Sequence, residues 1–201
     1  MTYKTDPSFF SYIKPPGSYI GISEITKWFE NSIHSRYRLI IDNELDELYA
    51  GLHERNEFYP GIKTFAVVIN PWARIKLVYD DLHRIEHELS DLASGTFTEF
   101  VNLLPTLSTD NIWYDRYHVL SPQNSWLEST HADGSINTVD YLFKVETLDT
   151  DFKVIQEYFE NDKPLTWLHT IPKYKSHYTA RTKRIVSDIF KEDIEKFGYT
   201  F

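Results

Sequence analysis

The stretch TFAVVINPWARIKLVYDD, residues 64–81, changes character at its centre and constrains the fold more than any other part of the chain. Its first half is a continuous apolar run rich in β-branched residues, which is typical of a strand covered on both faces of a sheet. The run breaks at Asn70-Pro71-Trp72, and a helical spacing with Arg74 and Lys76 follows. A buried strand that leads into a helix through a polar turn predicts a βαβ unit, and such turns are frequent binding places for anions.

The remaining segments alternate between strand-like and helix-like patterns. Strands are expected at residues 8–14, 36–41, 64–69 and 139–146. Helices are expected at residues 21–33, 43–55, 71–93, 96–104, 148–160 and 180–198. Residues 105–140 have no clear periodicity and form the longest loop-like region. This alternation predicts an α/β fold: a single domain over residues 1–201, with a mainly parallel central sheet flanked by helices.

Composition narrows the class of protein. The chain has 41% hydrophobic and 25% charged residues, no cysteine, and a net charge of −9. These values predict a soluble globular protein without disulfides, and the negative charge argues against general nucleic-acid binding. The sequence shows neither a signal-peptide pattern nor an apolar run long enough for a membrane span. Residues 173–184 depart from this balance, because they contain five Lys or Arg and no acidic residue.

Two other polar patterns are interpreted as structural. HRIEH, residues 83–87, has the spacing of an inverted zinc-peptidase motif and places His83 and His87 one helical turn apart. Both histidines lie well away from the apolar stripe of their helix, so a solvated surface is favoured over a metal site. Asp140 and Glu146 flank an expected strand, where carboxylates more often fix loops or helix starts than perform chemistry.

Three separated segments together resemble the sulfotransferase superfamily, especially its small carbohydrate-type branch. YIKPPGSYI, residues 12–20, is similar to the family's first loop. VINPWARIKLVY, residues 68–79, is similar to its Asn-Pro-Trp signature and retains Asn70, Pro71 and Trp72. VDYLFKVETLDTDFKVI and the Phe-Gly-Tyr-Thr-Phe ending resemble its last strand and its C-terminal segment. The order and spacing of these pieces, rather than any one of them, carry the resemblance.

The resemblance implies a P-loop-like first turn that binds the donor 3′-phosphoadenosine-5′-phosphosulfate. Lys14 and Ser18 would hold the phosphosulfate, and Gly17 would let the backbone approach the anion. Lys14 would also neutralise charge on the leaving oxygen, which makes it a catalytic candidate. For this loop alone, an ordinary turn between a strand and a helix is the competing interpretation.

The chain departs from the family pattern at the donor's 3′-phosphate. The arginine and the serine that grip this phosphate in the family are replaced here by Ile69 and Leu77, whose side chains donate no hydrogen bond. Pro15 and Pro16 also remove backbone N–H groups from the first loop. Cations of the basic stretch are candidates to replace the lost grip: Lys173, Lys175 and Arg181.

On the acceptor side, His118 followed by Pro122-Gln123 resembles a His and Pro-Gln element of the family. His118 is therefore the candidate general base for a hydroxyl acceptor, with a partly buried structural histidine as the alternative. Aromatic residues near it would form a stacking wall for a sugar, or simply pack the loop: Trp113, Tyr114, Tyr117 and Trp126.

Two functions of different class follow from this pattern. The first is a small sulfotransferase that moves a sulfuryl group from the donor to a hydroxyl, expected to be on a carbohydrate. The second is a degenerate sulfotransferase-fold module with protein partners, for instance in a virus particle or another complex. The expected location is accordingly cytoplasmic or within such a particle. Ile69 and Leu77, which replace the phosphate ligands, favour the degenerate module. The retained Lys14, Ser18 and His118 favour the sulfotransferase.

Overall fold

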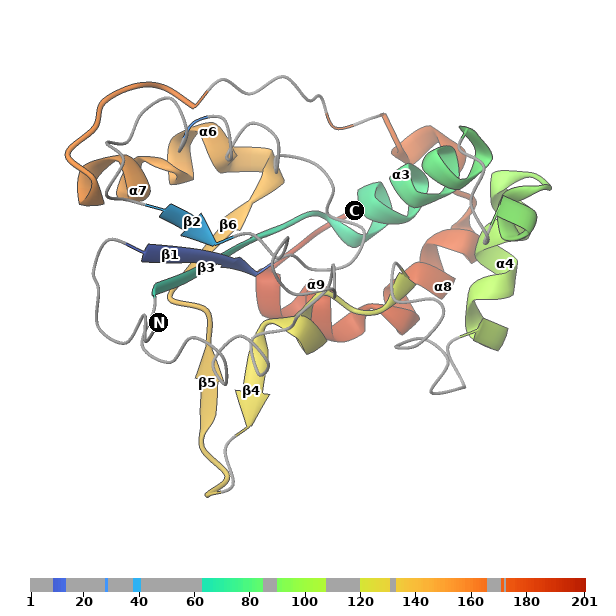
Figure 1. Cartoon of the computed structure of the whole chain (residues 1–201). Coiled ribbons are helices and arrows are strands. Elements are labelled where there is room, and N and C mark those ends of the chain that lie inside the picture. Colours follow the sequence, from blue (N-terminus) through green and yellow to red (C-terminus); the bar gives the residue numbers. More distant parts are fainter. Residues whose placement is uncertain are drawn as a thin grey trace. The chain divides into compact units, whose positions relative to one another are not determined.

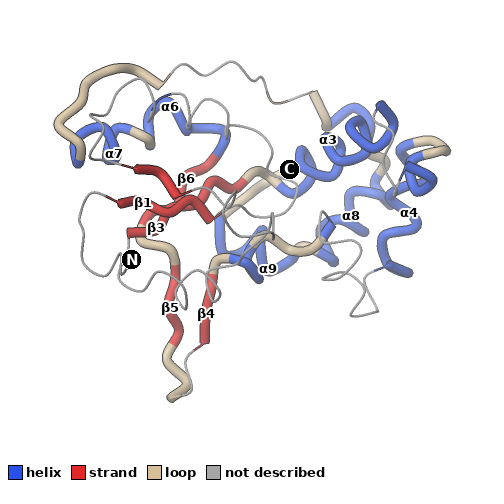
Figure 2. Tube along the Cα trace, in the orientation of Figure 1, coloured by secondary structure: helices blue, strands red, loops and turns tan. Residues whose placement is uncertain are grey.

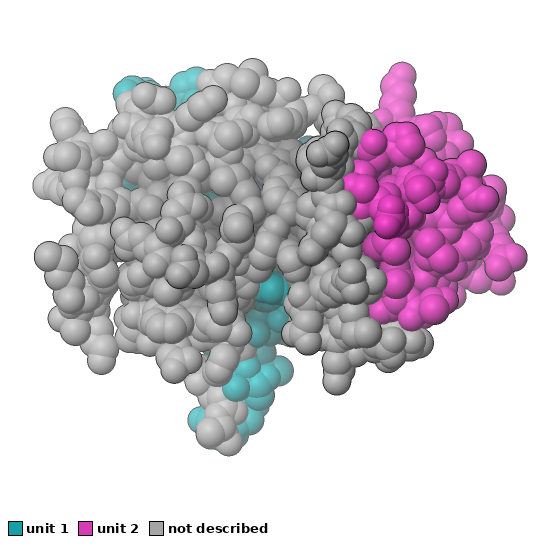
Figure 3. All heavy atoms as spheres, turned by 45° about the vertical axis from the view of Figure 1, so that its right-hand side comes forward, with its two compact units in different colours: residues 1–68, 125–170 teal, residues 69–124, 171–201 magenta. Residues whose placement is uncertain are grey.

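The computed structural model divides into two compact units, each built from two segments of the chain (Figure 3). Unit 1 comprises residues 1–68 and 125–170, and unit 2 comprises residues 69–124 and 171–201. The structure describes the following residues: 9–13, 28, 38–40, 63–84, 90–107, 120–130, 133–165, 171 and 173–201. The expected helix at 43–55, and that at 21–33 apart from Trp28, lie outside them. The single domain expected over the whole chain stays a prediction.

Unit 1 contains a small parallel sheet with the strand order β2-β1-β3-β6 (Figure 1). Its strands are β1 (Phe9–Ile13), β2 (Arg38–Ile40), β3 (Lys63–Val68) and β6 (Tyr141–Lys144). All three strand pairs are parallel, with Phe10 opposite Lys63 and Phe65 opposite Tyr141. Parallel neighbours require crossover connections, which is what the alternating sequence pattern predicts. The expected α/β character and the parallel pairing are thus confirmed.

Strand β3 lies between β1 and β6 and is buried on both faces. Only Lys63 at its start is exposed, and every residue from Thr64 to Val68 is buried. Asp140, just before β6, accepts hydrogen bonds from the backbone N–H of Thr64 at 2.8 Å and from the Lys63 ammonium at 2.5 Å. This carboxylate therefore ties the start of β3 to the start of β6, which is the structural role expected for Asp140.

Aromatic residues pack beside this sheet and join the helices that follow β6. The single expected helix at 148–160 is two short helices, α6 (Leu148–Asp151) and α7 (Lys153–Tyr158), which follow the 3₁₀ turn Val145–Thr147. Phe152, between them, is fully buried and contacts Phe143 of β6 at a ring-centroid distance of 6.1 Å. Trp28 meets Phe152 edge-on at 5.1 Å and donates a hydrogen bond to the Lys163 carbonyl.

The expected loop at 105–140 contains structure that the sequence pattern did not indicate. After the 3₁₀ turn Asn124–Trp126, strands β4 (Glu128–Thr130) and β5 (Ile136–Thr138) pair antiparallel, as Figure 2 shows in red. Asp133 accepts a hydrogen bond from the Ser135 N–H, and Gly134 takes a φ of +82°. Glycine adopts that angle without strain, so Gly134 fits the turn that leads into β5.

Unit 2 is helical in its described part. Its helices are α3 (Pro71–Arg84), α4 (Phe97–Leu107), α8 (Ala180–Ile189) and α9 (Lys191–Phe197), with 3₁₀ turns at Ser90–Ala93 and Lys175–His177. Figure 1 shows α3, α4 and α8 side by side, and both α3 and α4 contact α8. Helix α3 begins at Pro71 as predicted, and residues 85–89 of the expected helix 71–93 lie outside the described residues.

The expected closing helix at 180–198 is interrupted at Phe190, which separates α8 from α9. Phe190 has φ −103° and ψ +30°, outside the helical region, and its side chain is fully buried. The interruption places the Phe190 ring beneath the Arg74 guanidinium, 4.9 Å from the ring centroid. None of the helices in the described ranges has the length and apolar content needed to cross a membrane.

Candidate functional site

The residues singled out for the donor and acceptor sites fall into two groups. Lys14, Gly17, Ser18 and His118 lie outside the described residues, so their roles stay predictions. The others belong to unit 2, where the structure places Ile69 and Leu77 at the Asn-Pro-Trp signature and the three predicted cations near α8.

Ile69 sits at the junction between β3 and α3 and is fully enclosed. Its side chain has 0% exposure, and the Gln123 side chain occupies both polar groups of its backbone. The Ile69 N–H donates to Gln123 Oε1 at 3.0 Å, and Gln123 Nε2 donates to the Ile69 carbonyl at 2.8 Å. Gln123 thus continues the hydrogen bonding of a strand one residue beyond β3, and neither backbone group of Ile69 is open to an anion.

The Asn-Pro-Trp corner, residues 70–72, is held by hydrogen bonds to the C-terminal part of unit 2. Asn70 Oδ1 accepts from the Trp72 N–H, and Asn70 Nδ2 donates to the Thr200 carbonyl at 3.0 Å. Trp72 Nε1 donates to the Lys183 carbonyl, while the Tyr178 hydroxyl donates to the Trp72 carbonyl at 2.9 Å. The corner therefore docks α8 and the chain end, which is a structural use of the polar turn.

Arg74 points into the interior of unit 2, with 0% exposure. Its guanidinium donates to the Ser121 carbonyl at 2.7 Å and to the Leu120 carbonyl. Burial lowers the pKa of Arg74 to about 10, and the charge of Asp193 opposes that shift. Arg74 therefore has a structural role, because it caps carbonyl oxygens inside unit 2.

Asp193 of α9 is the buried acid that faces this arginine. Its carboxylate accepts from the backbone N–H groups of Gln123 and Asn124, both at 2.8 Å. Burial raises the pKa of the Asp193 carboxyl, against the opposing effects of the Arg74 charge and of these N–H donors. Arg74, Asp193 and Gln123 together form a buried polar network that links α3, α9 and the 120–124 segment.

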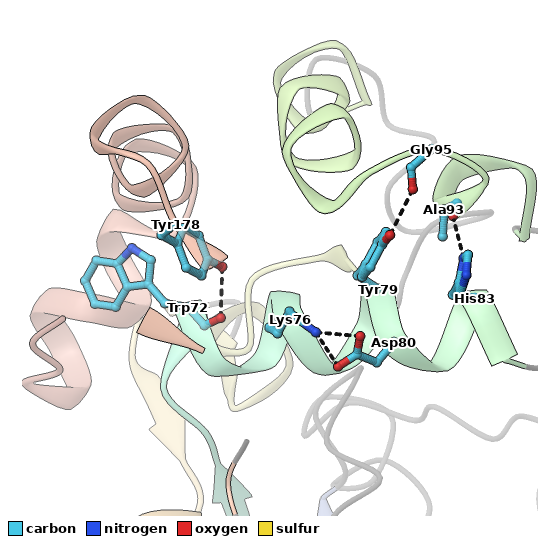
Figure 4. Close-up of polar contacts among 8 residues, drawn as sticks. All are labelled: Trp72, Lys76, Tyr79, Asp80, His83, Ala93, Gly95 and Tyr178. Atoms are coloured by element: carbon cyan, nitrogen blue, oxygen red, sulfur yellow. Dashed lines mark hydrogen bonds and ion pairs between the residues drawn. The ribbon is translucent and has the colours of Figure 1, made fainter. Parts of the chain in front are cut away.

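The outer part of α3 carries a second group of polar contacts, which Figure 4 shows. Lys76 Nζ reaches both carboxylate oxygens of Asp80, at 2.5 and 2.6 Å, and lies 5.7 Å from the centroid of the Tyr79 ring. The Tyr79 hydroxyl donates to the Gly95 carbonyl, and His83 Nδ1 donates to the Ala93 carbonyl. The contacts of Tyr79 and His83 join α3 to the 90–95 segment. Lys76 is paired with Asp80 of the same helix.

His83 has an exposed side chain, as its place on the helix predicts, whereas His87 lies outside the described residues. Within the described ranges, no group of three or more His, Asp or Glu side chains is placed to hold a metal ion.

The predicted cations of the 173–184 stretch lie on the surface of unit 2. Lys173, Lys175 and Arg181 are all exposed. The structure also brings Lys175 together with Lys183 at one aromatic ring, that of Phe201. Lys183 Nζ lies 4.2 Å and Lys175 Nζ 5.7 Å from its centroid.

The Phe201 ring is itself positioned by other aromatic residues. Trp72, Tyr174 and Tyr178 each contact it nearly at right angles, at ring-centroid distances from 5.5 to 5.9 Å. We call the five cations of this stretch the basic patch. They are Lys173, Lys175, Arg181, Lys183 and Arg184.

Sequence reasoning missed the residues that organise this region. Gln123 had been assigned only by resemblance to an acceptor-side element, and Asp193 looked like an ordinary charged residue in a helix. The one available signal for Asp193 was its position one turn after Phe190 in the apolar stripe of the expected helix.

Comparison with models of known protein families found no match for this chain, and comparison with curated protein sequences found none either.

In chemical terms, the described residues of unit 2 provide a hydrogen-bonded corner and exposed cations. At the junction and the start of α3, four residues each make at least one hydrogen bond or ion pair inside unit 2: Ile69, Asn70, Arg74 and Lys76. Cationic side chains near α8 face solvent and can meet an anionic group.

Proposed function

We propose that this chain is a sulfotransferase-like domain that no longer binds the nucleotide donor and serves as a binding or assembly module. The single observation that carries the proposal is the environment of Ile69. In the pattern that the chain resembles, this position supplies an arginine to the donor's 3′-phosphate. Here an aliphatic side chain with 0% exposure stands there, and Gln123 occupies its backbone groups.

The energetic argument concerns the loss of charge-assisted hydrogen bonds. Each such contact to a phosphate contributes about 1.5–3 kcal/mol. Replacing both grips, at Ile69 and Leu77, would weaken donor binding by roughly a hundredfold or more, because 1.4 kcal/mol corresponds to a factor of ten. Arg74, another cation of α3, is fully buried and donates to the Ser121 carbonyl, so it does not compensate.

The proposal also includes the arrangement of the whole chain. A single α/β domain with a P-loop-like first turn is the architecture that the resemblance implies, and the parallel strands β1, β3 and β6 are compatible with it. An assembly role places the protein in the cytoplasm or within a virus particle or other complex.

A thermal-shift titration with 3′-phosphoadenosine 5′-phosphate tests the proposal. A ligand that binds the native state stabilises it by about 2.7 kcal/mol at a hundredfold excess over its dissociation constant. We expect no change in melting temperature up to millimolar nucleotide. A saturable increase that adenosine 5′-monophosphate does not reproduce would overturn the proposal, because it would demonstrate recognition of the 3′-phosphate.

A donor-dependent sulfotransferase is the second candidate, and the exposure of Lys173, Lys175 and Arg181 favours it. On this alternative, the three cations replace the lost grip, and Lys14 and His118 act as the leaving-group cation and the base. Nucleotide binding that disappears in the Lys173→Ala/Lys175→Ala double variant would support it. Binding that is unchanged in that variant would remove the compensating role of these lysines.

A further inference from the structure

The basic patch is a concentration of positive charge in an acidic protein. Residues 173–184 contain five Lys or Arg and no acid, whereas the remaining residues contain 16 Lys or Arg and all 30 Asp or Glu. Four of the five cations have exposed side chains: Lys173, Lys175, Arg181 and Arg184. In the part of the chain that the structure describes, the 173–184 stretch therefore exposes positive charge while the net charge of the chain is negative.

An aromatic ring, rather than carboxylates, contacts two of the three lysines of this patch. In the part of the chain that the structure describes, none of the five cations forms an ion pair with an acidic side chain. Lys175 and Lys183 instead lie against the Phe201 ring, and contacts of this kind leave the ammonium N–H groups able to bind an anion. The aromatic contacts to Phe201 fix that ring, so the two ammonium groups are pre-organised.

An acidic surface of matching character lies on unit 1. Glu157, Glu160 and Asp162 are exposed and line an open hollow along α7, together with one cation, Lys153, so acidic side chains outnumber basic ones there. We call these three residues the acidic face. Beside it, α7 exposes two large hydrophobic side chains, Val154 at 38% and Tyr158 at 40%. Carboxylates next to exposed apolar and aromatic groups are a complement to lysines that surround a phenylalanine ring.

We propose that the basic patch of one copy of this chain binds the acidic face of a second copy, in a head-to-tail arrangement. Charge complementarity selects this pairing, because two basic patches facing each other across a two-fold axis would repel. A contact between two different surfaces of the same chain is heterologous, so it leaves one surface of each kind open at the ends of a dimer. It therefore propagates into rings or filaments, which is a property of an assembly component.

Sedimentation velocity of the full chain over a range of protein concentrations tests the pairing. We expect the weight-average mass to rise with concentration in about 20 mM NaCl. In about 1 M NaCl, where the Debye length is about 3 Å, the mass should return to that of one chain. A single-chain mass at every concentration in low salt would overturn the proposal.

Two charge-reversal variants identify the surfaces. The first is Lys175→Glu/Arg181→Glu/Arg184→Glu in the basic patch, and the second is Glu157→Lys/Glu160→Lys/Asp162→Lys in the acidic face. All six side chains are exposed, so each variant should keep the melting temperature of the parent within a few degrees. Each variant alone should associate at least about tenfold more weakly than the parent, because attraction becomes repulsion at every substituted position.

An equimolar mixture of the two variants should recover association, because each copy then meets a surface of opposite charge. A matched control exchanges the exposed pair Lys191 and Glu195 of α9, as Lys191→Glu/Glu195→Lys, and should leave the mass unchanged. Association that survives reversal of the acidic face, or a mixture that stays at the mass of one chain, would contradict the proposed pairing.

The inference rests on the proposed assembly role, yet its failure can be distinguished from that of the proposed function. A nucleotide-dependent thermal shift would overturn the loss of donor binding without affecting the sedimentation result. An unchanged mass in low salt would remove the head-to-tail pairing without restoring nucleotide binding.

Discussion

Replacing Gln123 by leucine should destabilise the protein far more than replacing a polar residue at its surface would. The side chain of Gln123 is fully buried and makes two hydrogen bonds to one residue, Ile69. Leucine fills a similar volume but makes neither bond. The Ile69 N–H and carbonyl would then stay buried without partners, since β3 ends at Val68.

The magnitude follows from the cost of unsatisfied buried groups. Each buried donor or acceptor left without a partner costs about 1–3 kcal/mol, so the pair at Ile69 should cost about 2–6 kcal/mol. The free energy of unfolding of a typical protein is about 5–15 kcal/mol. The substitution is therefore expected to remove a large fraction of the stability of the fold.

Urea unfolding followed by far-UV circular dichroism measures this change through linear extrapolation to zero denaturant. The matched control is Gln156→Leu on α7, where a partly exposed glutamine donates to the Lys163 carbonyl. Water can replace that bond, so the control should change the free energy of unfolding by no more than about 0.5 kcal/mol. Equal changes in the two variants would refute the view that Gln123 satisfies buried groups at the β3–α3 junction.

Two further substitutions test the charged contacts. Asp193→Ala removes the anion that faces buried Arg74, so it should lower the free energy of unfolding by about 3–5 kcal/mol in the same urea assay. A change below about 1 kcal/mol would mean that Arg74 does not depend on this carboxylate. Asp140→Asn should cost about 1 kcal/mol at pH 7, because the pair with Lys63 is partly exposed. Although partial burial opposes it, hydrogen bonds from Lys63 and Thr64 lower the folded pKa of Asp140 below 3.8. The contribution of Asp140 to the free energy of unfolding should therefore be complete above pH 3.8 and disappear as the pH falls through the lowered pKa. Urea titrations of the parent and of Asp140→Asn between pH 2 and pH 7 measure the difference in their free energies of unfolding. A difference that persists undiminished at pH 2 would contradict this assignment.

Local sequence information determined the strands and helices whose patterns are continuous. The apolar run at 64–69 predicted β3 to within one residue at each end, and Pro71 marked the start of α3. Pro71 starts that helix because the ring lacks an N–H that the first turn would leave unpaired in any case.

Other elements lacked a local signal. Strands β4 and β5 have three residues each, which is too short for an alternation to be recognised, although Asp133-Gly134 was a usable turn signal. The break at Phe190 was invisible, because an aromatic residue in the apolar stripe fits a continuous helix equally well. The break coincides with the buried contact of Phe190 with Arg74, more than a hundred residues earlier in the chain.

The sequence by itself determined the alternation of strand and helix, the negative overall charge, the basic stretch at 173–184, and the aliphatic residues at positions 69 and 77. Only the tertiary structure decided that Gln123 closes the backbone of Ile69, that Asp193 faces Arg74, and that two lysines share the Phe201 ring. The reason is physical. Periodicity and composition report the preferences of neighbouring residues, whereas burial of a polar group must be balanced by partners that only the folded chain brings within hydrogen-bonding distance.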